Sequence, residues 1–315
     1  ASSVHGSRAL NVPVVYHPFY SLPTLPPKHR FPMPVFRELY DYLLDSGLVL
    51  HSQIHIPALA TKTQLLLVHE ENYVARLIDG FLDDATMRKT GFPWSRELID
   101  RTLSEVGGTI LTAQLSLTSR IAVSIAGGTH HAFPSHGSGF CLINDLAVAI
   151  RVLQQNRLVD KVLIVDLDVH QGDGTSFIFQ DDPSVFTFDV HCASNFPLRK
   201  QKSSLDVGLP PGTGDEVYMD TLLTHLPRLL QQFCPDLVLY DAGVDPHGGD
   251  GLGKLNLTDL GLYQRDEYVI STCVSHGVPV ACFNGGGYAP DISVLVHRHA
   301  LLHKAARKVY ETLQV

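Results

Sequence analysis

The stretch Asp166-Leu167-Asp168-Val169-His170-Gln171-Gly172-Asp173 directly follows the apolar run Val162-Leu163-Ile164-Val165. A short run of aliphatic and β-branched residues predicts a buried strand of a parallel sheet. Side chains alternate along a strand, so Asp166, Asp168 and His170 are expected to face the same way. Two carboxylates and an imidazole at the end of a buried strand are costly unless a positive charge lies among them. The segment therefore predicts a metal site.

Strand-like and helix-like patterns alternate along the 315 residues on both sides of this segment. Apolar patterns predict strands at 121–126, 162–168, 185–190, 237–242 and 278–283. Amphipathic patterns predict helices at 35–44, 97–117, 145–155, 216–233, 260–275 and 297–313. Such alternation predicts a parallel sheet with helices on both faces. Because no linker or repeat divides the chain, we expect a single α/β domain over 14–315, preceded by a poorly ordered segment at 1–13.

Composition narrows the class of protein. The formal net charge of −8 argues against direct nucleic-acid binding. No apolar run approaches membrane-spanning length, so no membrane partner is expected. The five cysteines form no C-x-x-C pair, which is typical of a reducing compartment. We therefore expect an intracellular protein, in the cytoplasm, nucleus or a plastid, that is not secreted. Whether the first residues are a trimmed targeting peptide or a tag stays open, as does the oligomeric state.

Polar and glycine-rich segments follow each predicted strand, and in parallel sheets these carboxyl ends meet at one edge. We predict that Asp168, His170 and Asp245 bind the metal. One nitrogen and two oxygens with an open coordination position is the pattern of a catalytic zinc site. The predicted cofactor is one zinc ion.

Two adjacent histidines, His130 and His131, follow the glycines of another strand end. They suit a general base and its partner beside a metal-bound water. Each needs a carboxylate to fix its tautomer. We predict that Asp166 pairs with His130 and that Asp173 pairs with His131.

Further residues complete the predicted site. Tyr288, on a glycine-rich loop, is a candidate donor to a developing oxyanion. The predicted substrate contacts are Gly139, Phe140, Pro210 and Gly287. A Cys/His nucleophile at Cys141 is the competing interpretation, but it leaves the Asp/His cluster unexplained. The whole set predicts metal-assisted hydrolysis of an amide.

Six motifs resemble one known family, the zinc-dependent histone deacetylases. They are G-G-T-H-H-A at 127–132, G-F-C-L-I-N-D at 139–145, D-L-D-V-H-Q-G-D-G at 166–174, G-L-P-P-G-T-G-D at 208–215, D-A-G-V-D-P-H at 241–247 and G-G-G-Y at 285–288. The resemblance implies the arginase/deacetylase fold, with an eight-stranded parallel sheet. It also implies hydrolysis of N-acyl-lysine in histones or other proteins.

Within that family the chain is most similar to the class IV branch. Gln171 follows the ligand histidine where class I members usually carry a second histidine, and Asp189 stands where they carry serine. The segment 29–33 resembles a loop near the active-site mouth. The family also implies a structural potassium ion, held around Asp166, Asp168, His170, Asp189 and Val190.

Other functions remain open from the sequence. A small-molecule amidohydrolase acting on acetylpolyamines is the main alternative, and a catalytically inactive scaffold is a third. Arginase-type enzymes share the implied fold but hold two manganese ions with a D-A-H-x-D strand end. Here that segment lacks the extra carboxylate position and Tyr288 is added, which favours one zinc ion. The length of the acyl group is not predicted.

Overall fold

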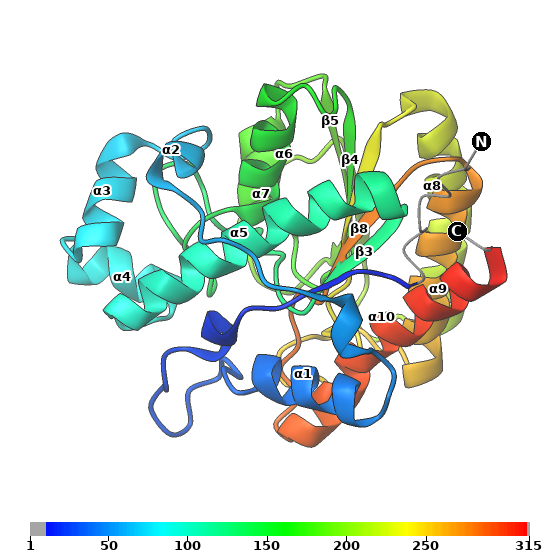
Figure 1. Cartoon of the computed structure of the whole chain (residues 1–315), viewed down its shortest axis with the longest axis horizontal. Helices are drawn as coiled ribbons and strands as arrows, with labels where there is room; N and C mark the ends of the chain where they lie inside the picture. Colours follow the sequence, from blue (N-terminus) through cyan, green and yellow to red (C-terminus); the bar gives the residue numbers. More distant parts are fainter. Residues whose placement is uncertain (1–10, 314–315) are drawn as a thin grey trace, which may run out of the picture.

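A computed structural model describes residues 11–313, which form one α/β domain around an eight-stranded, all-parallel sheet (Figure 1). The strand order is β2-β1-β3-β8-β7-β4-β5-β6. The strands are β1 (Val14–Val15), β2 (Ile54–His55), β3 (Ile121–Ser124), β4 (Val162–Asp166), β5 (Val185–Cys192), β6 (Leu205–Leu209), β7 (Leu237–Asp241) and β8 (Val280–Phe283). The predicted fold class is confirmed, including the strand number that the resemblance implied.

Two helical layers cover the sheet, as predicted. One contains α5 (Arg96–Ser119), α6 (Asp145–Gln155) and α7 (Asp173–Phe179). The other contains α1 (Val35–Asp45), α8 (Asp215–Phe233), α9 (Asp259–Ser275) and α10 (Ile292–Leu313), packed side by side. The short helices lie beyond one end of α5 (Figure 1), and they are α2 (Lys62–Leu65), α3 (Glu71–Asp79) and α4 (Asp84–Thr90).

The central strands are buried along their whole length because helices cover both faces. All five residues of β4 and all five of β7 are buried, in register from Val162 beside Leu237 to Asp166 beside Asp241. Near-continuous apolar strands are what such a doubly covered sheet requires. The carboxyl ends of β3, β8, β7, β4 and β5 therefore share one edge, where the predicted site residues gather.

Several predicted boundaries differ from the structure for local reasons. β8 begins at Val280 and not at 278, since Pro279 has no N–H for the sheet. α10 begins at Ile292 and not at 297, because Asp291 accepts the N–H groups of Ser293 and Val294. The strand predicted at 162–168 ends at Asp166, for a reason given below.

Other elements were not predicted at all. β1 and β2 have only two residues each, too few for a recognisable pattern, and β6 and α7 were also missed. Of the segment 1–13 predicted to be poorly ordered, residues 1–10 lie outside the described range. Val12 is buried, however, and the carbonyl of Pro13 accepts the N–H of Val123. Across residues 11–313 none of the helices has the length and apolarity that a bilayer span requires.

Candidate active site

The metal-ligand segment leaves the sheet as soon as β4 ends. Asp166 Oδ1 accepts the N–H of Asp168 at 3.2 Å, and Asp168 Oδ1 accepts the N–H of His170 at 2.8 Å. Short aspartate side chains compete with a sheet ladder for backbone donors. Two successive side-chain-to-backbone turns, and not the strand alternation expected from the sequence, therefore bring Asp168 and His170 into the site.

Asp168, His170 and Asp245 lie together beyond β4 and β7, and all three are buried. His170 Nδ1 is 2.9 Å from Asp168 Oδ1 and 3.2 Å from Asp245 Oδ2. One ligand atom from each of the three lies within 4.8 Å of the others. Asp245 Oδ1 accepts the N–H of Val169, whereas Asp245 Oδ2 has no hydrogen-bond donor.

These residues fit a divalent cation. Glycines keep the space beside them free, because a Cβ at Gly286 would lie 2.4 Å from Asp168 Oδ2 and 2.5 Å from Asp245 Oδ2. Burial, and then the charge of Asp168, raise the pKa of the Asp245 carboxyl to about 7. Buried carboxylates that repel one another, an oxygen without a donor and a mixed N/O donor set are what a metal such as zinc would stabilise.

Two buried His–Asp pairs stand beside the three candidate ligands. His130 Nδ1 is 2.6 Å from Asp166 Oδ2, and His131 Nδ1 is 2.7 Å from Asp173 Oδ1. Burial by itself lowers the pKa of His130, but the carboxylates of Asp166 and Asp168 raise it well above its ordinary value. Burial and the neighbouring His130 lower the pKa of His131 to about 4. The arrangement sets a neutral imidazole next to one that favours a proton.

Tyr288 is carried by the loop that follows β8. Its N–H donates to Asp250 Oδ1 at 2.7 Å, and Asp250 Oδ2 accepts the N–H groups of Leu252 and Gly253. Its ring lies 6.2 Å from the ring of His170, centroid to centroid. Burial, and then the charges of Asp168 and Asp245, raise the pKa of the Tyr288 phenol well above 10. The hydroxyl therefore keeps its proton and can donate it in a hydrogen bond.

Gly139 and Phe140 lie on the wall of the cavity. A Cβ at Gly139 would come within 2.8 Å of the His131 ring and 3.0 Å of the Phe196 ring. Phe140 has a φ of 66°, and its ring lies 5.9 Å from that of Tyr288. Both residues line the cavity together with His130, His131 and the ligands Asp168 and His170.

The other two predicted substrate contacts lie elsewhere. Pro210 is exposed, and its carbonyl accepts hydrogen bonds from Thr213 in a surface turn. A Cβ at Gly287 would meet Val244 and Leu295, so this glycine faces α10. Neither is among the described residues that line the cavity, so the structure does not bring these two together with the other predicted site residues. Both lie beside motif residues, and proximity in sequence does not fix the direction that a turn residue faces.

Three contributors were missed. Phe196 is 44% exposed and lies edge-on to His131 and to His170, with ring centroids 5.0 Å and 6.5 Å apart, so it stands beside the site. Asp145 accepts the N–H groups of Gly128 and Thr129, which fixes the loop that carries the histidines. Asp241 is fully buried with neither oxygen hydrogen-bonded, and its Oδ2 lies 3.8 Å from His130 Nδ1. A polar residue directly after a buried strand was the available signal for Asp241.

Two further residues were singled out in the sequence. Asp189 Oδ1 is 2.7 Å from His191 Nδ1, and its Oδ2 accepts the N–H of Gly172, so both oxygens have partners within the chain. Cys141 is buried, and burial raises the pKa of its thiol. A protonated, buried thiol is a poor nucleophile, which argues against the Cys/His interpretation.

Comparison with known proteins identifies the family. The model of the histone deacetylase domain matches residues 29–302. This chain belongs to the histone deacetylase family. Membership makes this histone deacetylase homologue a hydrolase of acetylated amides, and the Asp/His clusters of its cavity supply residues that could bind a metal.

Relatives span most of this histone deacetylase homologue. It is 57% identical to an uncharacterized protein of Picosynechococcus sp. over 96% of this chain and 100% of that protein. It is 30% identical to histone deacetylase 2 of Arabidopsis thaliana, over 82% of this chain and 70% of that protein. It is 29% identical to the acetoin utilization protein AcuC of Staphylococcus aureus, over 83% and 73% of the two chains.

Proposed function

We propose that this chain is a zinc-dependent deacylase of acyl-lysine side chains in proteins, of which histones are one candidate. The observation that carries the proposal is the meeting of three metal ligands, two His–Asp pairs and Tyr288 around one buried cavity. Metal-assisted hydrolysis of an amide uses a Lewis acid, a general base, a general acid and an oxyanion donor. The cavity has side chains that could hold the metal and a side chain for each of the other roles.

The residues would divide the reaction as follows. Zinc held by Asp168, His170 and Asp245 would supply Lewis acidity toward the amide carbonyl and lower the pKa of a water molecule. His131 takes the proton of the attacking water, since Asp173 engages Nδ1 and leaves Nε2 as the base. Tyr288 donates its O–H to the oxyanion of the tetrahedral carbon. His131, or His130 beside it, then protonates the departing lysine amine.

We also propose the class IV assignment and a structural potassium ion. The class IV assignment is supported by the presence of Gln171 directly after His170. The structure holds this glutamine in place, because its amide Nε2 donates to Gln201 O and Asp206 Oδ1. The potassium ion would be held by carbonyls around Asp166, Asp168, His170 and Val190, next to Asp189. The register that sets Asp166 beside Asp189 supports this position.

A protein substrate is favoured over an acetylpolyamine by the charges near the site. The loop that carries Phe196 also carries Leu198, which is 95% exposed, and exposed Arg199 and Lys202. Arg30 is a further exposed cation beside Tyr288. These side chains would repel a slim polycation such as a polyamine, and likewise the basic stretches of a histone, whereas other protein segments can offer apolar and acidic groups to them.

A substrate panel tests this choice. We expect kcat/KM for acetyl-lysine peptides to exceed that for acetylpolyamines by at least about tenfold, as about 1.4 kcal/mol of differential transition-state binding requires. Free amine and released carboxylate are measured together by mass spectrometry, with acetyl, longer acyl and lactyl peptides included. A tenfold preference for acetylpolyamines would replace the proposal with the small-molecule alternative.

A further inference from the structure

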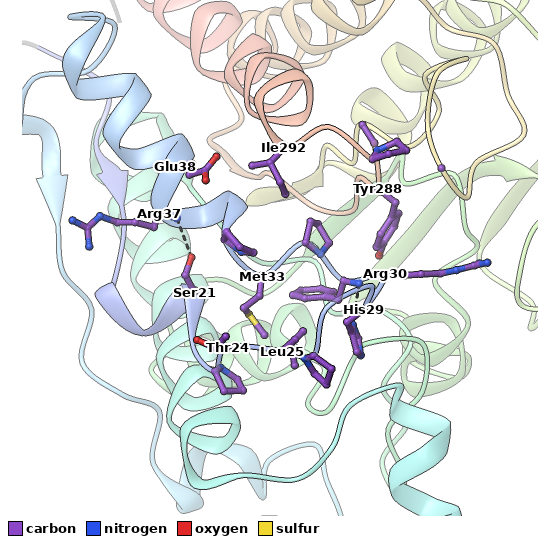
Figure 2. A pocket seen from close by; sticks show the side chains of 18 of the residues that line it. Ser21, Thr24, Leu25, His29, Arg30, Met33, Arg37, Glu38, Tyr288 and Ile292 are labelled. Carbon is purple, nitrogen blue, oxygen red and sulfur yellow. Dashed lines mark hydrogen bonds between the residues drawn. The ribbon is translucent and has the colours of Figure 1, made fainter.

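A groove of about 730 Å³ opens beside Tyr288, outside the catalytic cavity (Figure 2). One side is the proline-rich segment 21–34, and the other is the start of α10 with the residues just before it. Its size is in the range of pockets that bury a drug-sized ligand or several side chains. The reaction proposed above uses none of this volume.

The middle of the groove is apolar. The side chains of Leu25 and Met33 point into it from one side, and Ile292 points toward it from the other (Figure 2). Prolines at 23, 26, 32, 34 and 290 complete the lining and lack backbone donors that would otherwise need partners. Apolar surface of this kind is stabilised when another apolar side chain covers it.

The groove adjoins the catalytic cavity. Phe31 and Tyr288 line both spaces, so the two lie side by side at these residues. When an acyl-lysine side chain enters the cavity, its backbone stays at the mouth, and the neighbouring residues lie within reach of the groove. A substrate without flanking residues cannot use it.

Charge distinguishes the ends of the groove. The end formed by α1 carries Arg37, which is engaged by Asp41 at 3.1 Å, and the exposed carboxylate of Glu38, so it offers no free cation. Arg30, at the end near Tyr288, is exposed and makes no ion pair with any residue in the range 11–313. A free guanidinium next to an apolar groove is complementary to a carboxylate that follows or precedes an apolar residue.

We propose that this groove binds the polypeptide on one side of the acyl-lysine, with an apolar side chain among Leu25, Met33 and Ile292 and an acidic side chain against Arg30. The inference rests on the proposed protein-deacylase function and adds a sequence preference to it. The groove would then distinguish substrates by the residues that flank the acyl-lysine.

The test is a scan of acetyl-lysine peptides. In a glycine-serine background, leucine is placed in turn at each of the four positions before the acetyl-lysine and each of the four positions after it. Glutamate or lysine is then placed directly before or directly after the leucine. We expect kcat/KM to rise at least about tenfold at one leucine position, the effect of burying one such side chain. At that position glutamate should exceed lysine by at least about threefold, the size of a surface ion pair.

Substitutions in the groove test whether it causes the leucine and glutamate preferences. Arg30→Glu should invert the glutamate-over-lysine preference and leave the leucine preference, while Leu25→Ser should weaken the leucine preference. Arg228→Glu, an exposed charge reversal on α8, is the matched control and should change neither. Arg228→Glu should also hydrolyse acetyl-lysine amide without flanking residues at the wild-type rate.

The possible results distinguish failure of the groove inference from failure of the proposed deacylase function. A flat peptide scan, or an Arg30→Glu protein that behaves like Arg228→Glu, overturns the groove inference while acetyl-lysine hydrolysis upholds the function. A wild-type protein that hydrolyses no acetyl-lysine substrate, but does hydrolyse acetylpolyamines, overturns both.

Discussion

Tyr288→Phe is expected to lower kcat for an acetyl-lysine peptide by about 100-fold or more, because it removes one preorganised donor to the oxyanion. The backbone of residue 288 should keep its place, since Asp250 holds the N–H and not the hydroxyl. The phenol has its role only when negative charge develops on the carbonyl oxygen, so KM should change little. Steady-state kinetics on wild type and variant provide the measurement.

Tyr263→Phe is the control for that experiment, because it also removes a tyrosine hydroxyl, but from α9 and not from the cavity. It should retain wild-type kcat. Metal content and melting temperature of Tyr288→Phe should match those of the wild type. If its kcat stays within a few-fold of the wild-type value, Tyr288 is not the oxyanion donor.

Asp245→Asn is expected to abolish metal binding and lower kcat/KM by at least about 1000-fold, since a bound metal contributes several kcal/mol of transition-state stabilisation. The amide oxygen can still accept the N–H of Val169, so the turn after β4 should persist. Metal content by elemental analysis and activity are measured on the same samples.

Thermal unfolding separates lost binding from lost folding in Asp245→Asn. Without metal, the variant should melt at the wild-type temperature or above it, because one of several buried, mutually repelling charges is gone. Added zinc should raise the melting temperature of the wild type and not that of the variant. Asp220→Asn, on the exposed face of α8, should respond to zinc as the wild type does. A variant that still binds one equivalent of zinc would exclude Asp245 as a ligand.

Much of the fold could be predicted from the sequence because helices cover both faces of its central strands. Strands such as β4 and β7 must be apolar up to the aspartate that ends each of them, and α6 was predicted with the bounds it has. β1 and β2 join the sheet with two residues each, held by tertiary contacts and not by any pattern of their own. Sequence periodicity has nothing to detect in such short strands.

The candidate site also has parts that the sequence predicts and parts that it does not. The cluster of candidate metal ligands and both His–Asp pairs follow from residue types at strand ends, because a buried carboxylate or imidazole requires a partner. The route by which Asp168 and His170 converge was misjudged, since side-chain-to-backbone turns replace the strand after Asp166. Phe196 and the groove at 21–34 depend on how loops distant in sequence meet, which local patterns do not encode.

The proposed function requires that this cavity hydrolyse acyl-lysine with one bound metal ion. The most direct measurement counts metal per chain and acetyl-lysine turnover together, after chelator treatment and again after addition of zinc. We expect activity to be lost with the metal and to recover to its maximum at about one zinc per chain. Full activity in the metal-free chain, a requirement for two metal ions, or activity that depends on the Cys141 thiol would contradict it.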